Sequence, residues 1–327
     1  MLTSGTLRVM LTRGGRPART RDQLVQAPAP FIVGAGRSGT TMLRLMLDAH
    51  PQLAIPPETH FIPHVSELCA AAQAPATLAL DAIVAADRWP SFELDPDMLR
   101  RQAATSGCRS LADVLRLFYR TYAVSRGKPR WGDKTPWYVL RMPLIAELLE
   151  EAHFLHIIRD GRDVALSVIP LWFGPKSVPE AAAWWAQRVR AGRRDGAHLA
   201  YLEIRYEQLV QRPATELRRL CAFIGLDFDA QMLSFDELVR RRAVTVAPHL
   251  ADLSLAAALA AEPRGAESAP ETLIGPDEMR ARLTSRLSGP PDASSVGRWR
   301  TEMTGAEQRS FAEVAGDLLE ELGYPLA

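Results

Sequence analysis

Short apolar runs alternate along the chain with longer stretches in which apolar positions recur at helical spacing. The runs 31–33 and 154–158 are dense enough in apolar residues for strands covered on both faces of a parallel sheet. Two further short strands are expected at 53–55 and 199–204. Because strands that alternate with helices are typical of α/β domains, the pattern predicts a parallel sheet flanked by helices.

The longer stretches have the periodicity of helices that bury one side or more. Helices are expected at 41–49, 60–73, 111–126, 137–151, from about residue 162, and at 179–197, 213–224 and 304–322. The segment 251–275 differs, because it is rich in Ala, Leu, Glu and Pro and has no settled period. We therefore expect a single domain over 29–327 with a mobile insertion around 251–292.

Composition and charge exclude several classes of protein. The 327 residues carry a formal net charge of +1, which gives no reason to expect nucleic acid or an anionic membrane as partner. Cys69, Cys108 and Cys221 lie far apart, so neither a disulfide framework nor a zinc site is expected. No run approaches the roughly 18 apolar residues that span a bilayer. We expect a cytoplasmic protein without a membrane span or a bound metal.

The first 28 residues have their own composition. They contain Arg8, Arg13, Arg16, Arg19 and Arg21 before or beside the first acidic residue, Asp22. No sustained apolar stretch of the kind found in a secretory signal accompanies them. We expect residues 1–28 to form a disordered basic tail.

The segment GAGRSGTT, residues 34–41, runs from a predicted strand into a predicted helix. Glycines let such a loop turn tightly and present its N–H groups to an anion, and the helix N-terminus adds positive charge. Gly34 and Gly39 have the spacing of the GxxxxG in a nucleotide-binding P-loop, and Thr41 takes its Ser/Thr position. Thr40, however, stands where the Walker lysine would be.

The missing lysine changes the expected ligand. In nucleoside triphosphate enzymes that lysine serves the β- and γ-phosphates. A loop that carries Arg37 instead suits a less charged anion, such as a phosphosulfate. A P-loop kinase and an ordinary strand-to-helix turn are the alternatives for this segment.

The segment IIRDGRDVALS, residues 157–167, is a second corner between a strand and a helix. Arg159 comes at the carboxyl end of the strand, where open α/β sheets bind ligands. Ser167 follows eight residues later. Arginine offers a planar, bidentate match to phosphate, so the two corners fit a nucleotide with phosphate groups at two ends. Asp160 and Asp163 are expected to cap the helix or to pair with arginines.

The sequence GAGRSGTTMLRLMLDAHP resembles the 5′-phosphosulfate loop of sulfotransferases that use 3′-phosphoadenosine 5′-phosphosulfate (PAPS), and IIRDGRDVALS resembles their 3′-phosphate segment. PPETHFIP, GDKTPWY, EIRYEQLVQRP and GRW extend the resemblance over about 31–225 and 297–325. It is closest to bacterial sulfotransferases related to the tyrosylprotein sulfotransferases. The resemblance implies a P-loop-like α/β fold and in-line sulfuryl transfer without a metal.

The resemblance also implies roles for particular residues. The 5′-phosphosulfate would be held by Arg37, Ser38, Gly39, Thr40 and Thr41. The 3′-phosphate would be held by Arg159 and Ser167, with Tyr206 near the nucleotide and Arg298 closing on it. The chain departs from the tyrosylprotein enzymes at Leu171, where they carry an arginine.

Sulfuryl transfer needs a base for the acceptor hydroxyl and positive charge at the leaving phosphate. Glu58 follows Arg37 by 21 residues, which matches the position of the family's catalytic glutamate. His60 is the second candidate base, since its ordinary pKa is nearer neutrality and other branches use a histidine near here. Lys134 is the expected stabiliser of the leaving group, a role that Arg37 would share.

The acceptor is not identified by the sequence beyond a hydroxyl of peptide tyrosine, carbohydrate, lipid or a small molecule. A homodimer is compatible with the sequence. The alternative functions are a P-loop kinase and a nucleotide-binding protein that lacks sulfotransfer activity.

Overall fold

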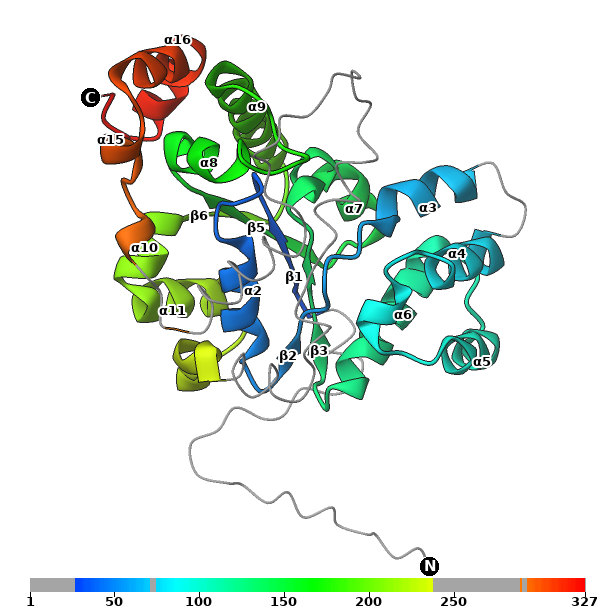
Figure 1. Cartoon of the computed structure of the whole chain (residues 1–327). Helices are drawn as coiled ribbons and strands as arrows, with labels where there is room; N and C mark the ends of the chain where they lie inside the picture. The colour runs from blue at the N-terminus through cyan, green and yellow to red at the C-terminus, as the bar shows by residue number, and fades with distance from the viewer. Residues whose placement is uncertain (1–26, 71–74, 238–288, 290–292, 327) are drawn as a thin grey trace, which may run out of the picture.

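A computed structural model describes residues 27–70, 75–237, 289 and 293–326 (Figure 1). The predicted basic tail lies outside the described residues except for its last two positions. The predicted insertion at 251–292 also lies outside them except for Gly289.

Within the described part of the chain, a four-stranded parallel sheet has the strand order β4-β1-β5-β6. Its strands are β1 (Ala29–Val33), β4 (Asp133–Lys134), β5 (Ala152–Ile158) and β6 (Tyr201–Arg205). Because all the strands run in the same direction, their carboxyl ends meet at one edge. This sheet confirms the predicted α/β class.

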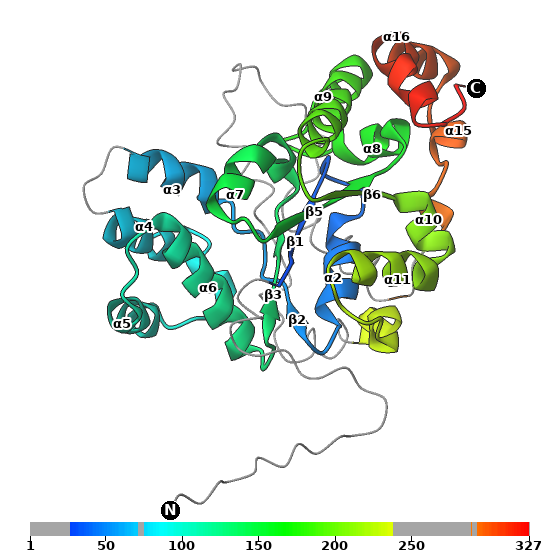
Figure 2. The same ribbon diagram turned by 180° about the vertical axis from the view of Figure 1, so that it is seen from behind.

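Helices cover both faces of this sheet (Figures 1 and 2). Alternate residues of the strands point to opposite faces, so Ile32 and Leu155 join one core cluster while Phe31 and Phe154 join another. The first cluster includes α2 (Thr40–Asp48), α10 (Tyr206–Gln211) and α11 (Pro213–Phe223). The second includes α6 (Leu111–Ser125), the 3₁₀-helix η2 (Pro136–Leu140) and α7 (Met142–Leu148).

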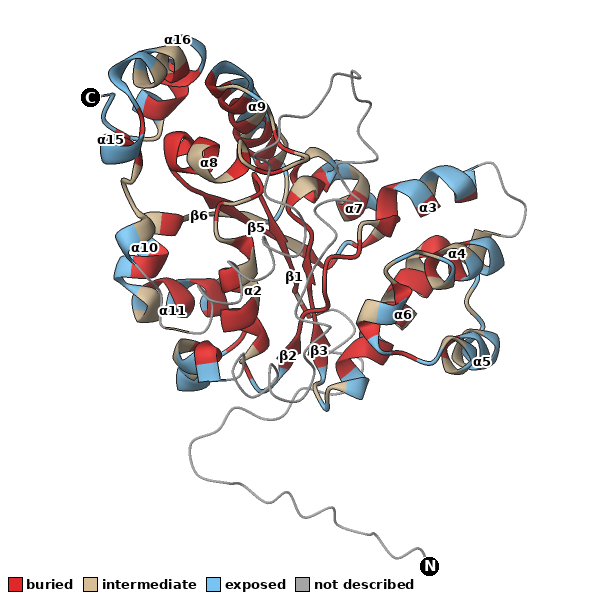
Figure 3. Cartoon of the chain, in the orientation of Figure 1, coloured by how far each residue is buried: buried red, intermediate tan, exposed pale blue. Residues whose placement is uncertain are grey.

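A helical lobe follows β1 and α2 in the chain and lies to one side of the sheet (Figure 3). It contains α3 (Phe61–Ala70), α4 (Pro75–Val84), the 3₁₀-helix η1 (Trp89–Phe92), α5 (Pro96–Ser106) and α6. Phe61, Phe92 and Phe118 form an edge-to-face aromatic cluster at its centre. A two-stranded parallel sheet of β2 (Leu53–Ala54) and β3 (Arg130–Trp131) lies beside it. The strand expected at 53–55 therefore belongs to this small sheet.

The remaining helices pack together beyond β5. They are α8 (Gly161–Val168), α9 (Val178–Gly196), α15 (Trp299–Glu302) and α16 (Gly305–Glu321). Trp185 on α9 and Phe311 on α16 are fully buried against each other over Gly161. The last helix therefore returns to the start of α8, close to the second corner predicted from the sequence.

Several elements, among them β3, α4, α5 and α10, were not expected from the sequence, and two further differences lie close to the site. The single helix expected over 137–151 is split into η2 and α7, because Arg141 has a non-helical φ of −134° and a proline occupies the first turn of α7. Strand β4 was not expected, because its two residues, Asp133 and Lys134, are polar. None of the described helices is both long and apolar enough to cross a membrane.

Candidate active site

Both predicted corners lie at the carboxyl edge of the sheet. Val33 at the end of β1 is paired with His156 in β5, so the loop after β1 and the corner after β5 begin side by side. The guanidinium of Arg159 bridges them, because its Nη1 donates to the carbonyl oxygen of Arg37 at 3.2 Å. The two corners thus face one site.

The loop between β1 and α2 has the backbone of an anion cradle. Arg37 has a φ of 70° and Gly39 a φ of 95°, so the chain turns through left-handed conformations before the helix begins. A Cβ on Gly39 would lie 2.5 Å from the ring of Tyr206, so only glycine fits there. Ser38 is completely buried, and its Oγ has no hydrogen-bond partner among the described residues. Since buried hydroxyls normally have a partner, Ser38 fits a site for a bound anion.

Arg159 is buried rather than part of a surface salt bridge, with 4% of the residue exposed. Its Nη2 donates to the carbonyl oxygen of Ser295 and lies 3.6 Å from a carboxylate oxygen of Asp163. The guanidinium carbon lies 4.6 Å from the centre of the Tyr206 ring. These contacts hold the guanidinium at the corner, while its Nε has no hydrogen-bond partner in the described part of the chain.

Tyr206 joins the loop to the C-terminal segment. Its ring packs against Gly39, and its hydroxyl hydrogen-bonds to Oγ of Ser295 at 2.6 Å. Tyr206 therefore lies beside both corners, and its place near the nucleotide stays a prediction.

Within the described ranges, Ser167 and Arg298 form hydrogen bonds with neighbouring residues and not with the loop after β1. Ser167 lies on α8, and its hydroxyl donates to the carbonyl oxygen of Asp163 at 3.0 Å. Arg298 precedes α15 and donates to both carboxylate oxygens of Glu302, the last residue of that helix, at 2.7 and 2.6 Å. The segment around Arg298 is nevertheless brought to α8, because Asp163 accepts from the backbone N–H groups of residues 297 and 299 at 2.7 and 3.0 Å.

The catalytic candidates meet at the β4 side of the loop. Lys134 ends β4 beside Ile32 of β1, and the next residue but one, Pro136, accepts a hydrogen bond from the N–H of Gly34 at 3.0 Å. Nζ of Lys134 donates to Oε1 of Glu58 at 2.5 Å, although the residues are 76 positions apart. Nε2 of His60 lies 2.7 Å from Oε2 of the same carboxylate. All three groups are therefore close to the predicted phosphosulfate loop.

A buried polar network fixes the segment that carries Glu58 and His60 to the segment that carries Lys134. Oγ1 of Thr59 donates to Asp133 at 2.8 Å, and the N–H of Thr59 donates to Oγ1 of Thr135 at 3.1 Å. Tyr119 donates to the same carboxylate oxygen at 3.0 Å, and the hydroxyl of Tyr138 lies 3.0 Å from Oγ1 of Thr59. Burial raises the pKa of Asp133 to about 6 despite these hydrogen bonds. Sequence reasoning missed this network, because its members lie in three separate segments.

Residues 28–230 match the sulfotransferase family, which is more than half of the chain. The chain belongs to this family. It is 27% identical over 228 residues to protein-tyrosine sulfotransferase A of Caenorhabditis elegans, covering 65% of this chain and 54% of that protein. It is 26% identical over 324 residues to the nodulation protein NoeE of Sinorhizobium fredii, covering 90% of this chain and 65% of that protein. The chain thus spans little more than half the length of the first of these relatives.

Solved sulfotransferase domains share the fold. The domain from the olefin synthase of Synechococcus PCC 7002 matches with a TM-score of 0.57 at 21% identity, covering 92% of this chain and 96% of that chain. The domain from the curacin biosynthetic pathway matches with a TM-score of 0.54 at 20% identity, covering 92% and 99%. These matches confirm the predicted sulfotransferase fold.

Two further side chains approach Glu58 and His60. Nε1 of Trp137, on η2, donates to Nδ1 of His60 at 2.6 Å. Nη1 of Arg88, which precedes η1, donates to the carbonyl oxygen of Glu58 at 2.9 Å. Trp137 lies in the GDKTPWY segment, but the resemblance implies no role for it, and Arg88 lies in a part of the helical lobe for which the sequence predicts no element.

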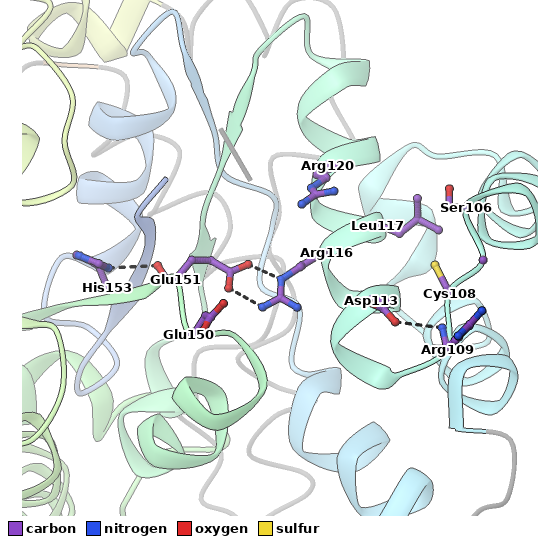
Figure 4. Close-up of a pocket in the computed structure, with 11 residues that line it drawn as sticks. Ser106, Cys108, Arg109, Asp113, Arg116, Leu117, Arg120, Glu150, Glu151 and His153 are labelled. Carbon is purple, nitrogen blue, oxygen red and sulfur yellow. Dashed lines mark hydrogen bonds and ion pairs between the residues drawn. The ribbon is translucent and has the colours of Figure 1, made fainter. Parts of the chain in front are cut away.

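A separate cavity of about 830 Å³ lies near the amino ends of the strands (Figure 4). Arg116 on α6 spans it and donates to both carboxylate oxygens of Glu151 at 2.7 Å. Its lining contains as many acidic as arginine side chains and none of the predicted site residues. Across the described residues, no group of three or more His, Cys, Asp or Glu side chains is arranged to hold a metal ion.

Proposed function

We propose that this sulfotransferase moves the sulfuryl group of PAPS to the hydroxyl of an acceptor. The observation that carries the proposal is the order of groups along the carboxyl edge of the sheet. The pair Glu58–Lys134 lies on the β4 side of the phosphate loop, and Arg159 lies on its β5 side. A nucleotide with an anionic group at each end could contact both sides of such a site.

The nucleotide would bind through the loop and the second corner. The N–H groups at the start of α2 and the hydroxyl of Ser38 would hold the 5′-phosphosulfate, together with Arg37, Thr40 and Thr41. Arg159 would hold the 3′-phosphate, with help from Ser167, and Arg298 would close on the nucleotide. The buried, unsatisfied Oγ of Ser38 and Nε of Arg159 support this fit.

In the proposed reaction Glu58 takes the proton of the acceptor hydroxyl, and the acceptor oxygen attacks sulfur in line. Lys134 and Arg37 stabilise the negative charge on the bridging oxygen as its bond to sulfur breaks. Glu58 is only 5% exposed, and its partner Lys134 is completely buried. Such a dry site strengthens each of these electrostatic interactions.

The names of the relatives suggest an acceptor with a hydroxyl group but do not favour one class of acceptor. One relative is named for protein tyrosine and another for nodulation. We therefore propose testing a tyrosine-containing peptide, an oligosaccharide, a lipid alcohol and a simple phenol with ³⁵S-labelled PAPS. Transfer of label to at least one of them supports the proposal. Binding of labelled PAPS without transfer to any acceptor or to the components of a cell extract would favour a nucleotide-binding protein without sulfotransfer activity.

The kinase alternative is tested separately. The loop lacks the Walker lysine, because Thr40 occupies its place. Calorimetry should therefore detect binding of 3′-phosphoadenosine 5′-phosphate without Mg²⁺ and no comparable binding of ATP with Mg²⁺. Tighter binding of Mg²⁺-ATP would contradict the proposal.

A further inference from the structure

We propose that Trp137 and His60 form a positioning pair that holds the carboxylate of Glu58 through a one-way chain of hydrogen bonds. The inference deepens the proposed function and rests on it for the role of Glu58 as base. It assigns His60 a positioning role and assigns a role to Trp137.

The direction of the chain follows from the chemistry of its first member. An indole nitrogen can only donate a hydrogen bond, so Nδ1 of His60, 2.6 Å from Nε1 of Trp137, must accept. A neutral imidazole then carries its hydrogen on Nε2. That nitrogen lies 2.7 Å from Oε2 of Glu58 and therefore donates to it. Trp137 thus selects the tautomer of His60 that can hold the carboxylate.

The backbone holds both members in place. His60 has a φ of 54°, a conformation that residues with a Cβ seldom adopt, between the network residue Thr59 and the first residue of α3. The planes of the His60 and Trp137 rings make an angle of 22° and their centroids are 6.1 Å apart, as expected for a hydrogen bond that lies close to both ring planes. Trp137 directly follows Pro136, which accepts the hydrogen bond of Gly34. The pair therefore ties the carboxylate to the start of the phosphate loop.

The two oxygens of Glu58 have different partners as a result. Oε2 accepts from the neutral N–H of His60, while Oε1 accepts from the ammonium of Lys134. When Lys134 turns to the leaving oxygen, Oε1 can receive the acceptor proton while His60 still prevents the carboxylate from rotating. His60 itself offers no basic nitrogen to the acceptor in this arrangement, because Nδ1 accepts from Trp137 and Nε2 carries the hydrogen.

Several charged groups surround the imidazole. Glu58 lies on its own segment, Lys134 at the end of β4 and Arg88 ahead of η1. Asp133 belongs to the network that binds the neighbouring Thr59. The carboxylate of Glu58 favours a charged ring, but a proton on Nδ1 would have to displace the N–H of Trp137, so the contact with Trp137 opposes a second proton on the imidazole.

Kinetics of three variants test the pair. His60→Gln keeps an N–H donor near the place of Nε2 and should retain most of kcat. His60→Leu removes the donor and should lower kcat by about 10- to 100-fold, as expected for a lost hydrogen bond to a charged group, with the KM for PAPS unchanged. Trp137→Phe keeps an aromatic ring but removes the donor to Nδ1, so kcat should gain an ionisation near the ordinary histidine pKa of about 6.5 and fall below it.

Trp89→Phe, a matched change in the helical lobe, should leave the pH profile unaltered, and circular dichroism checks that each variant is folded. The positioning role is overturned if His60→Gln is as inactive as Glu58→Gln. It is also overturned if His60→Leu keeps the wild-type kcat or if Trp137→Phe keeps the wild-type pH profile. If the wild type transfers no label at all, it is the proposed function that fails.

The hydrogen-bond chain from Trp137 to Glu58 can also be tested by a measurement that needs no turnover. In protein labelled with ¹⁵N-histidine, the signals of His60 are identified by their loss in His60→Gln. They should report hydrogen on Nε2 and none on Nδ1 down to about pH 5.5, one unit below the ordinary histidine pKa. A hydrogen on Nδ1, or a doubly protonated ring at about pH 6.5, would refute the inference.

Discussion

Glu58 and Lys134 are both withdrawn from water, so each charge depends on the other. A buried ion pair is costly to break, because removing one partner leaves the other charge without compensation. The pair is supported by the donor His60 and by the backbone contact of Arg88. At the scale of single residues, the site is therefore a carboxylate whose position is fixed from several sides.

Glu58→Gln tests the proposed base. The amide keeps the shape of the side chain but cannot take a proton, so turnover should fall by about 10²- to 10⁴-fold, the usual contribution of a general base. Binding of 3′-phosphoadenosine 5′-phosphate, measured by calorimetry, should stay within a few fold of wild type. Transfer of label from PAPS at the wild-type rate would rule out Glu58 as the base.

Asp133 gives the fold a pH dependence of known sign. Its pKa is raised by burial from 3.8 to about 6 in the folded protein. The folded state therefore holds the proton of Asp133 more tightly than the unfolded state does. The protonated carboxyl stabilises the folded protein fully below pH 3.8, and this stabilisation is lost as the pH rises through about 6. Two pKa units correspond to about 3 kcal/mol.

Asp133→Asn lacks this ionisation. The free energy of unfolding of the wild type, relative to the variant, should therefore fall by about 3 kcal/mol between about pH 4 and about pH 7. Urea denaturation at several pH values measures the difference, and lost hydrogen bonds of the variant add only a constant. A difference that does not change with pH would contradict the assignment.

At the scale of elements, helix α8 is held by two buried acids at its start. Asp160 caps it by accepting from the N–H of Arg162 at 3.0 Å, and Asp163 holds the segment that leads into α15. Both acids therefore act within the protein, as the sequence analysis predicted. Arg159, at the end of the preceding strand, is left to face the loop after β1.

The start of α8 is packed too closely for any side chain. A Cβ on Gly161 would lie 2.5 Å from the ring of Trp185 and 2.6 Å from that of Phe311. Gly161→Ala should lower stability by about 1–3 kcal/mol, the usual effect of overpacking a core. Gly305→Ala is the matched control at a helix start, where the nearest atom would be 3.5 Å away. Equal melting temperatures for the two variants would show that α8, α9 and α16 pack differently.

The elements that carry strong apolar runs were predictable, and those that depend on contacts between distant segments were not. Strand β5 and helix α6 bury continuous or regularly spaced apolar residues, so their periodicity identifies them. Strand β4 consists of two polar residues and forms because it pairs with β1. Helix α5 buries only Leu99 and offers almost no periodic signal.

At the scale of the whole molecule, the sheet arranges the chemistry in one line. The strand order β4-β1-β5-β6 brings Lys134, the phosphate loop, Arg159 and Tyr206 to neighbouring positions at the carboxyl edge. The motifs at both corners could be found in the sequence, because each glycine-rich or arginine-bearing turn is local. The Thr59–Asp133 network and the contact of Trp137 with His60 could not, since they join residues 74 to 77 positions apart.

The central claim is that both corners bind one nucleotide, with Arg159 on its 3′-phosphate. Calorimetry with 3′-phosphoadenosine 5′-phosphate and with adenosine 5′-phosphate, on the wild type and on Arg159→Ala, tests it most directly. The account predicts that the wild type prefers the bisphosphate by about 10- to 100-fold, as for charge-assisted hydrogen bonds, and that Arg159→Ala loses this preference while Arg193→Ala keeps it. Equal affinity of the wild type for both nucleotides, or an unchanged preference in a folded Arg159→Ala variant, would contradict it.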